Sequence, residues 1–192
     1  MELTRSLVEA KAAEYRAEEP LHAVEQQHLE IVPGTFAGDD YGWRDVEWLV
    51  QWYFRRHLGA YSNRERRTNE AAIRENDFGT VVEVLGAVAG SATTDERLEE
   101  LTSLVGVDVP VASAFLTFMF PDRYVVVGER EWRVLRAAGE LDRSYPDPVT
   151  ADDYRGYLAV CRGLADRFDV DLWTVYRALW RLDEGASASD SD

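Results

Sequence analysis

One stretch of this chain concentrates arginine and could bind the phosphates of a nucleic acid. Residues 55–74 hold six arginines and two glutamates, a local charge of +4 in a protein whose formal net charge is −15. The arginines that we single out are Arg55, Arg56, Arg64, Arg66 and Arg67. Arginines with an interleaved aromatic such as Tyr61 can follow a phosphate backbone. The composition leaves a second interpretation open, in which these arginines pair with surrounding carboxylates on a solvated face.

A second chemical feature is a tight turn at Gly106, Val107 and Asp108. The turn follows a predicted helix, and an apolar helix resumes at Val109. Such a turn can present backbone N–H groups and a helix N-terminus to a phosphate. Asp108 itself is interpreted first as a cap for the helix that begins at Val109, because aspartate commonly accepts hydrogen bonds from the first N–H groups of a helix.

The order of these features resembles the helix-hairpin-helix superfamily of base-excision DNA glycosylases. The resemblance spans roughly residues 43–182. Its fragments are the LxGVx turn, Pro110-Val-Ala-Ser113, Pro121-Asp-Arg-Tyr124 and Arg177-Ala-Leu-Trp180, with Trp52, Arg67 and Asn76 upstream. It implies an all-α fold of two helical lobes, double-stranded DNA as the partner, a role in DNA repair and a flipped base in the cleft between the lobes.

The same resemblance implies two catalytic groups, and the chain departs from both. The essential carboxylate falls on Gly128, and the lysine with which bifunctional members form a Schiff base falls on Pro110. The single lysine, Lys11, belongs to a distant N-terminal helix, so lyase chemistry is not expected. Glu129 could replace the lost carboxylate, but the step of about 100° per helical residue points it elsewhere. We therefore favour loss of catalysis over replacement.

Three functions stay open at this point. The first is a DNA-binding protein with a glycosylase-like fold and a degenerate catalytic site, contacting DNA through the turn and the arginines. The second is an active monofunctional glycosylase in which Glu129, or another acid such as Glu131, supplies the carboxylate. The third is a non-catalytic protein–protein interaction domain with an aromatic surface and an acidic shell. Asp108 stands where the family turn has its second glycine, which weakens the expected phosphate grip.

The elements that must position these groups are helices almost throughout. Apolar spacing and capping residues predict helices over 2–19, 21–30, 44–58, 64–74, 78–89, 93–104, 109–120, 129–138, 150–168 and 172–182. We expect a break at Pro33-Gly34 and a short extended segment over 121–127. We divide the chain into N-terminal helices and a loop (1–42), a helical domain (43–183) and a disordered acidic tail (184–192).

The composition sets further limits. A chain of 192 residues with 46% hydrophobic residues and six Trp can bury a real core, which excludes a disordered protein despite the charge. Its 36 acidic residues accompany twenty arginines and one lysine, a balance typical of a halophile, although a GC-rich genome also favours arginine.

No metal site or cofactor is expected from the sequence. Cys161 is the only cysteine, and His22, His28 and His57 lack metal-ligand spacing. No apolar stretch approaches the roughly 20 residues that a membrane helix needs, so we expect a cytoplasmic protein without a membrane partner. The sequence leaves the oligomeric state open.

Overall fold

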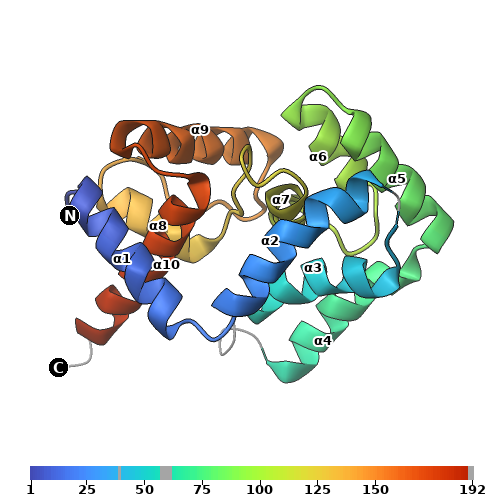
Figure 1. The fold of residues 1–192 in the computed structure, drawn as a ribbon, viewed down its shortest axis with the longest axis horizontal. Helices are drawn as coiled ribbons and strands as arrows, with labels where there is room; N and C mark the ends of the chain where they lie inside the picture. The colour runs from blue at the N-terminus through green and yellow to red at the C-terminus, as the bar shows by residue number, and fades with distance from the viewer. Residues whose placement is uncertain (39, 57–61, 190–192) are drawn as a thin grey trace.

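The computed structural model describes residues 1–38, 40–56 and 62–189, with the backbone alone for 184–189. Over these ranges the chain forms ten α-helices and one short 3-10 helix, and no strand, which confirms the all-α prediction (Figure 1). The elements in chain order are α1 (Arg5–Glu18), α2 (His22–Ala37), α3 (Trp43–Arg55), α4 (Asn63–Ala72), η1 (Ile73–Glu75), α5 (Phe78–Gly90), α6 (Thr94–Thr102), α7 (Val109–Met119), α8 (Glu129–Ala137), α9 (Ala151–Phe168) and α10 (Leu172–Ser189).

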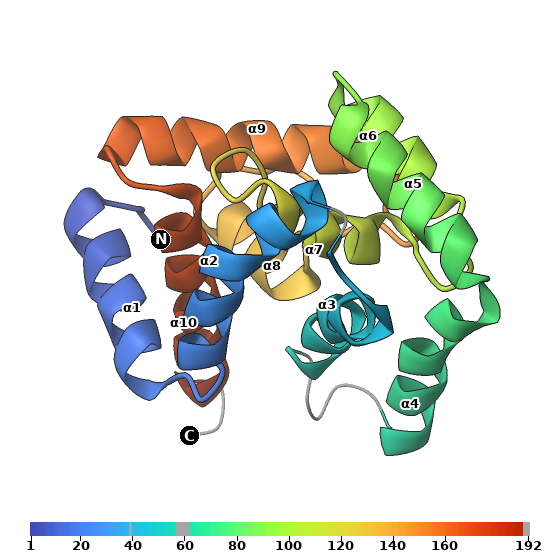
Figure 2. The ribbon, with the colours of Figure 1, turned by 45° about the vertical axis from the view of Figure 1, so that its right-hand side comes forward.

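Helix α7 lies at the centre of the fold (Figure 2). Every residue from Pro110 to Met119 is buried, and α2, α3 and α6 all pack against this helix. A helix that is apolar on all sides must be enclosed by other elements, because it has no face to leave in water. The apolar run at 109–120 therefore forms the axis around which the other helices are arranged.

The two ends of the chain meet in one core. Helix α1 lies along α10 (Figures 1 and 2), and Val8, Ala12 and Tyr15 are buried there. Arg181 of α10 pairs with Glu18 of α1, and the N-terminal amino group donates to the carbonyl oxygen of Ala137 at 3.1 Å. The N-terminal helix α1 is thus packed on the C-terminal helix α10.

Local capping chemistry sets several helix starts as the sequence predicts. Thr93 and Thr150 each form a capping box with the acid three residues on, and Asp77 accepts from the N–H of Gly79 at 2.9 Å. Asp171 accepts from the N–H of Thr174 at 2.6 Å. These starts follow from short-range hydrogen bonds, so tertiary context does not move them.

Two predicted boundaries are wrong. Helix α2 does not break at Pro33 but continues to Ala37, because Val32 and Phe36 are buried on either side of the proline. That burial outweighs the single backbone hydrogen bond that proline removes. Helix α10 also continues to Ser189, so the backbone of 184–189 is helical where we expected a disordered tail. Glu184, Ala186 and Ala188 favour helix and extend one that is already anchored.

The prediction of an extended segment over 121–127 is wrong at its start, because 121–123 form a turn in which the N–H groups of Arg123 and Tyr124 donate to the carbonyl oxygen of Phe120 at 2.9 and 3.1 Å. The chain from 124 to 128 has no regular secondary structure, and side chains hold it in place. Ser113 of α7 accepts from the N–H of Val127 at 3.0 Å. Tyr154 and Tyr157 of α9 donate to the carbonyl oxygens of Val125 and Val126 at 3.1 and 3.0 Å. These bonds replace strand pairing for a buried backbone. They also fix the chain immediately before Gly128.

The turn between α6 and α7 packs directly against α4. Gly106 has φ of +79°, and a Cβ atom there would lie 2.7 Å from the Cβ of Ala72. Asn76 clamps the same turn: its amide nitrogen donates to the carbonyl oxygen of Val105 at 3.0 Å, and its oxygen accepts from the Val105 N–H at 2.9 Å. Gly106 is required both for its backbone conformation and for the close approach of α4.

The close approach can be measured with a pair of glycine substitutions. Gly139 has nearly the same φ, +76°, but nothing lies within 4 Å of a Cβ placed on it. Gly139→Ala should therefore cost about 1 kcal/mol from backbone strain alone, and Gly106→Ala about 2–4 kcal/mol because overpacking adds to it. Urea unfolding of both variants tests this. Equal losses of stability would contradict the close packing of the turn on α4.

Candidate functional site

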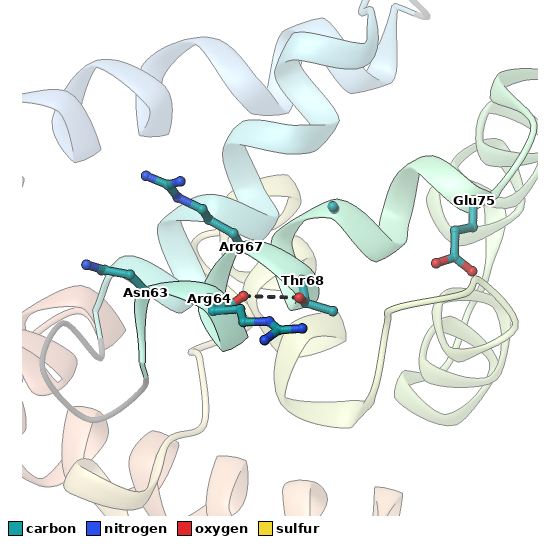
Figure 3. A pocket seen from close by; sticks show the side chains of 6 residues that line it. Asn63, Arg64, Arg67, Thr68 and Glu75 are labelled. Carbon is teal, nitrogen blue, oxygen red and sulfur yellow. Dashed lines mark hydrogen bonds between the residues drawn. The ribbon is translucent and has the colours of Figure 1, made fainter.

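The exposed face of α4 carries two of the predicted DNA-binding arginines. Arg64 and Arg67 are exposed and line an open hollow of about 690 Å³ together with Asn63, Thr68 and Glu75 (Figure 3). Neither arginine has an ion pair within the described residues. The Thr68 hydroxyl donates to the carbonyl oxygen of Arg64 at 3.0 Å. This face offers two uncompensated guanidinium groups to solvent.

The remaining predicted arginines are placed elsewhere. Arg66 pairs with Glu70 at 2.6 Å, and Arg74 pairs with Glu47 at 2.5 and 2.8 Å. Arg55 is exposed, but it lines a separate cavity between α2 and α3. His57 and Tyr61 belong to 57–61, outside the described residues. The structure thus brings Arg64 and Arg67 together and separates Arg55 from them.

The prediction that Arg56 belongs to an exposed basic strip is wrong. Its side chain is only 1% exposed and forms an ion pair with Glu131 of α8, so it cannot follow phosphates at the surface. The reason is the helical spacing: Arg56 follows Tyr53 by three residues and Trp52 by four, which places it on the buried face of α3. Its guanidinium carbon lies 5.0 Å from the ring centroid of Trp52 and 5.1 Å from that of Tyr176.

The turn at Gly106 combines backbone N–H donors with a carboxylate. The Asp108 carboxylate accepts from the N–H of Val111 at 2.9 Å, as expected for a helix cap. Pro110 has no N–H, whereas the N–H groups of Gly106, Asp108 and Val109 have no hydrogen-bond partner within the described residues. The exposed carboxylate of Asp108, which lies among these donors, would repel a phosphate. The turn lines a hollow of about 410 Å³ with Asn69 and Ala72 of α4.

Gly128, Glu129 and Glu131, the three positions considered for a catalytic carboxylate, differ in their burial. Gly128 is buried and begins α8. The Glu129 side chain is 59% exposed and pairs with Arg133 at 3.3 Å, so it points away from the interior. Glu131 is fully buried, and its Oε2 atom would lie 2.5 Å from a Cβ atom on residue 128. The carboxylate of Glu131 therefore occupies the space where a side chain at residue 128 would begin.

The Arg56–Glu131 pair is one end of a larger buried polar network that sequence reasoning missed. Tyr176 of α10 accepts from Arg56 Nε at 3.1 Å, and its hydroxyl lies 3.5 Å from that of Tyr15. Tyr15 donates to both oxygens of Glu25, at 2.8 and 2.9 Å. Trp52 Nε1 donates to the same carboxylate at 2.8 Å. Five helices, α1, α2, α3, α8 and α10, are linked through these side chains.

Burial and neighbouring groups shift the acid–base behaviour of this network. Burial raises the pKa of Glu25 above its ordinary value of 4.5, although the hydrogen bonds from Trp52 and Tyr15 act in the opposite direction. For Arg56, burial alone would lower the pKa, but the Glu131 carboxylate and the Tyr176 oxygen outweigh it, and the pKa is raised. Arg56 therefore stays charged within the core.

Neither a metal cluster nor a membrane-spanning helix occurs in the described ranges. No group of three or more His, Cys, Asp or Glu side chains is arranged there to hold a metal ion. None of the helices there is both long enough and apolar enough to cross a bilayer. Cys161 is buried, and burial raises the pKa of its thiol to about 12.

Comparison of the chain with protein-family models, with curated proteins and with solved structures found no match.

The contact between Gly128 and Glu131 predicts the effect of adding a single methyl group. Gly128→Ala should destabilise the protein by about 1–3 kcal/mol, because the new Cβ must displace a buried, paired carboxylate. Gly86→Ala in α5 is the matched control: nothing lies within 4 Å of its Cβ, and alanine should stabilise that helix by about 0.5–1 kcal/mol. Chemical unfolding compares the two. If Gly128→Ala left the free energy of unfolding unchanged, Glu131 would not occupy this space.

The raised pKa of Glu25 predicts a pH dependence of stability. The folded state binds the proton of the Glu25 carboxyl more tightly than the unfolded state does. The stabilisation of the folded state by this proton is therefore fully present below pH 4.5 and is lost as the pH rises through the raised pKa. Glu25→Gln does not titrate. The stability of the wild type relative to this variant should fall with rising pH, by at most about 1.4 kcal/mol per pH unit.

Urea unfolding between about pH 4 and pH 8 measures this difference. Glu99→Gln, at an exposed position of α6, is the control for removing one glutamate. If the wild type instead gained stability over Glu25→Gln as the pH rose, the direction that we assign to this pKa shift would be wrong.

Proposed function

We propose that this protein binds double-stranded DNA without cleaving glycosidic bonds, and that α4 supplies the main contacts. The observation that carries the proposal is that the turn at Gly106 packs against the same helix that carries Arg64 and Arg67. Arg64 and Arg67 lie on the exposed face of α4, and Ala72 at the end of the same helix packs against Gly106. A basic strip and a hairpin turn on opposite sides of the molecule would have argued against such a function.

The chemistry of the α4 face suits a phosphate backbone. Two guanidinium groups without carboxylate partners in the described residues stand beside the polar side chains of Asn63 and Thr68. In a chain of net charge −15, two adjacent unpaired cations form a local positive field that the overall charge hides. Phosphate contacts of this kind position a protein on DNA without selecting a sequence.

The hairpin turn has a different role in this proposal from the one in the resembling family. The turn keeps backbone N–H groups, but the exposed Asp108 carboxylate among them makes it a poor site for a phosphate. Its packing against Ala72 instead holds α4 at a fixed angle to the centre of the fold. We infer that the turn positions the arginines, and that the arginines make the contact.

The state of the acids supports a non-catalytic role. Stabilising a developing sugar cation requires a carboxylate that the substrate can reach. Glu129 is directed to solvent and paired with Arg133, while Glu131 is enclosed and neutralised by Arg56. Lys11, the only lysine, pairs with Glu14 in α1 at 2.7 Å.

One observation favours the alternative of an active monofunctional glycosylase. Glu131 Oε2 lies directly against Gly128, and within the described residues it has no hydrogen-bond partner. If α3 and α8 separated on binding DNA, this oxygen would be the carboxylate nearest to the family position. Incubation with lesion-bearing duplexes, followed by alkaline cleavage of abasic sites, tests this. Cleavage that Glu131→Gln abolishes would replace our proposal with the alternative.

Charge reversal on α4 tests DNA binding itself. The double variant Arg64→Glu/Arg67→Glu should weaken binding to a duplex by about 10–100-fold, because it removes two phosphate interactions and adds two repulsive charges. The slope of log K against log salt should also become shallower, by about 0.9 for each arginine that no longer neutralises a phosphate. Fluorescence anisotropy with a labelled duplex over a series of salt concentrations gives both values.

The control is Arg136→Glu, which reverses an exposed arginine on α8. It should leave affinity and salt slope nearly unchanged. If both variants lost the same amount of affinity for the duplex, binding would depend on overall charge alone and not on α4. If the wild type did not bind the duplex at low salt, the proposal would be overturned. Gel filtration with light scattering, with and without the duplex, separates DNA binding from self-association.

A further inference from the structure

A small cavity lies between α2 and α3. Leu21, Val24, Trp48, Trp52 and Arg55 line it, and its volume is about 90 Å³. None of these residues lines the hollow on α4. Arg55 is the only charged side chain among the lining residues that the structure describes. The cavity thus combines an apolar interior with one cation.

Contacts with residues of α2 fix the two tryptophan side chains that line this cavity. Trp52 Nε1 donates to the buried Glu25 carboxylate at 2.8 Å. Trp48 stacks on His28 with ring centroids 3.4 Å apart and planes 5° apart, and His28 Nδ1 lies 2.8 Å from the carbonyl oxygen of Val24. Walls that are already ordered reduce the conformational entropy that a ligand must overcome.

The surface beside the cavity is unusually apolar for this protein. Val24 and Ile31 are 40% and 51% exposed, and they lie seven residues apart on one face of α2. Among the described residues, the only other large hydrophobic side chains exposed to this degree are Met1 and Val105. Of Val24 and Ile31, Val24 itself lines the cavity, and an exposed apolar side chain at a cavity favours a binding site.

Arg55 leaves its charge available. Its guanidinium donates to the Gln51 side chain at 3.2 Å, and none of the carboxylates that the structure describes forms an ion pair with it. Many of the other arginines do have such a partner, as in the pairs of Arg66 and Arg74. A neutral amide orients the guanidinium without cancelling its attraction for an anion.

We propose that this cavity binds a small organic acid with a branched apolar end and one carboxylate. The apolar end enters between Trp48 and Trp52, and the carboxylate pairs with Arg55. An engineered cavity of about 150 Å³ holds benzene, so the smaller volume here suits a branched group of roughly four carbons. The cavity shares no lining residue with the hollow on α4, so this proposal does not rest on DNA binding.

The test uses 4-methylpentanoate as the probe and the indole N–H resonances of the intact protein as the readout. The probe should shift the Trp48 and Trp52 signals and saturate with a dissociation constant of about 1–10 mM, as expected for so small a ligand. The Trp132 signal should stay fixed, because Trp132 does not line the cavity and donates to the Arg143 carbonyl oxygen. Acetate, which has the charge but no apolar end, should shift none of them.

Two further comparisons distinguish the contribution of the ligand's charge to binding from that of its apolar shape. The neutral isostere 4-methylpentanamide should bind at least fivefold more weakly than the acid, and Arg55→Gln should remove that preference. Arg136→Gln, the matched change at an exposed arginine of α8, should preserve it. Equal binding of acid and amide to the wild type, equal shifts of Trp132, or no shift at about 50 mM probe would each overturn the proposal.

Discussion

The ion pair between Arg56 and Glu131 constrains more of this structure than any other single contact. It joins α3 to α8 where both side chains are fully enclosed. Removing two charges from water is costly, and their mutual attraction offsets this only with close geometry and further favourable contacts. The Tyr176 hydroxyl oxygen accepts a hydrogen bond from the guanidinium, whose central carbon lies 5.0 to 5.2 Å from the ring centroids of Trp52, Tyr176 and Trp180. Breaking the pair would leave an uncompensated charge in the core.

The same pair explains why residue 128 is glycine and why a surface arginine is missing from the basic strip. The Glu131 carboxylate fills the space beside the Gly128 Cα atom, so any side chain there would collide with it. Arg56, at the end of α3, is withdrawn from solvent to neutralise that carboxylate, so it does not contribute to the exposed positive charge. One internal electrostatic requirement thus accounts for the glycine at 128 and for the burial of one arginine of the predicted basic strip. It also ties the proposed loss of catalysis to the stability of the fold.

How far the sequence predicts the structure depends on the range of the interactions involved. The caps at Asp77, Asp108 and Thr150 involve groups within three residues, so they are readable in the sequence. The continuation of α2 through Pro33 depends on what Val32 and Phe36 pack against, which no local pattern contains. The sequence does contain a pattern that could have identified Glu25 and Glu131 as buried acids. Each acid shares a helical stripe with buried apolar residues, such as Val32 for Glu25 and Leu135 for Glu131, and a carboxylate in such a stripe indicates a buried partner.

The sequence by itself determined the all-α fold, the apolar helix over 109–120, the capped helix starts and the presence of a single lysine, Lys11. These follow from composition, periodicity and hydrogen bonds between near neighbours. Only the tertiary structure decided which arginines face solvent, that Arg56 is a core residue, and that Glu131 rather than Glu129 lies beside Gly128. Six arginines within twenty residues look alike in a sequence. Their environments differ because each depends on helices far along the chain, and a buried charge is stable only where such a helix supplies its partner.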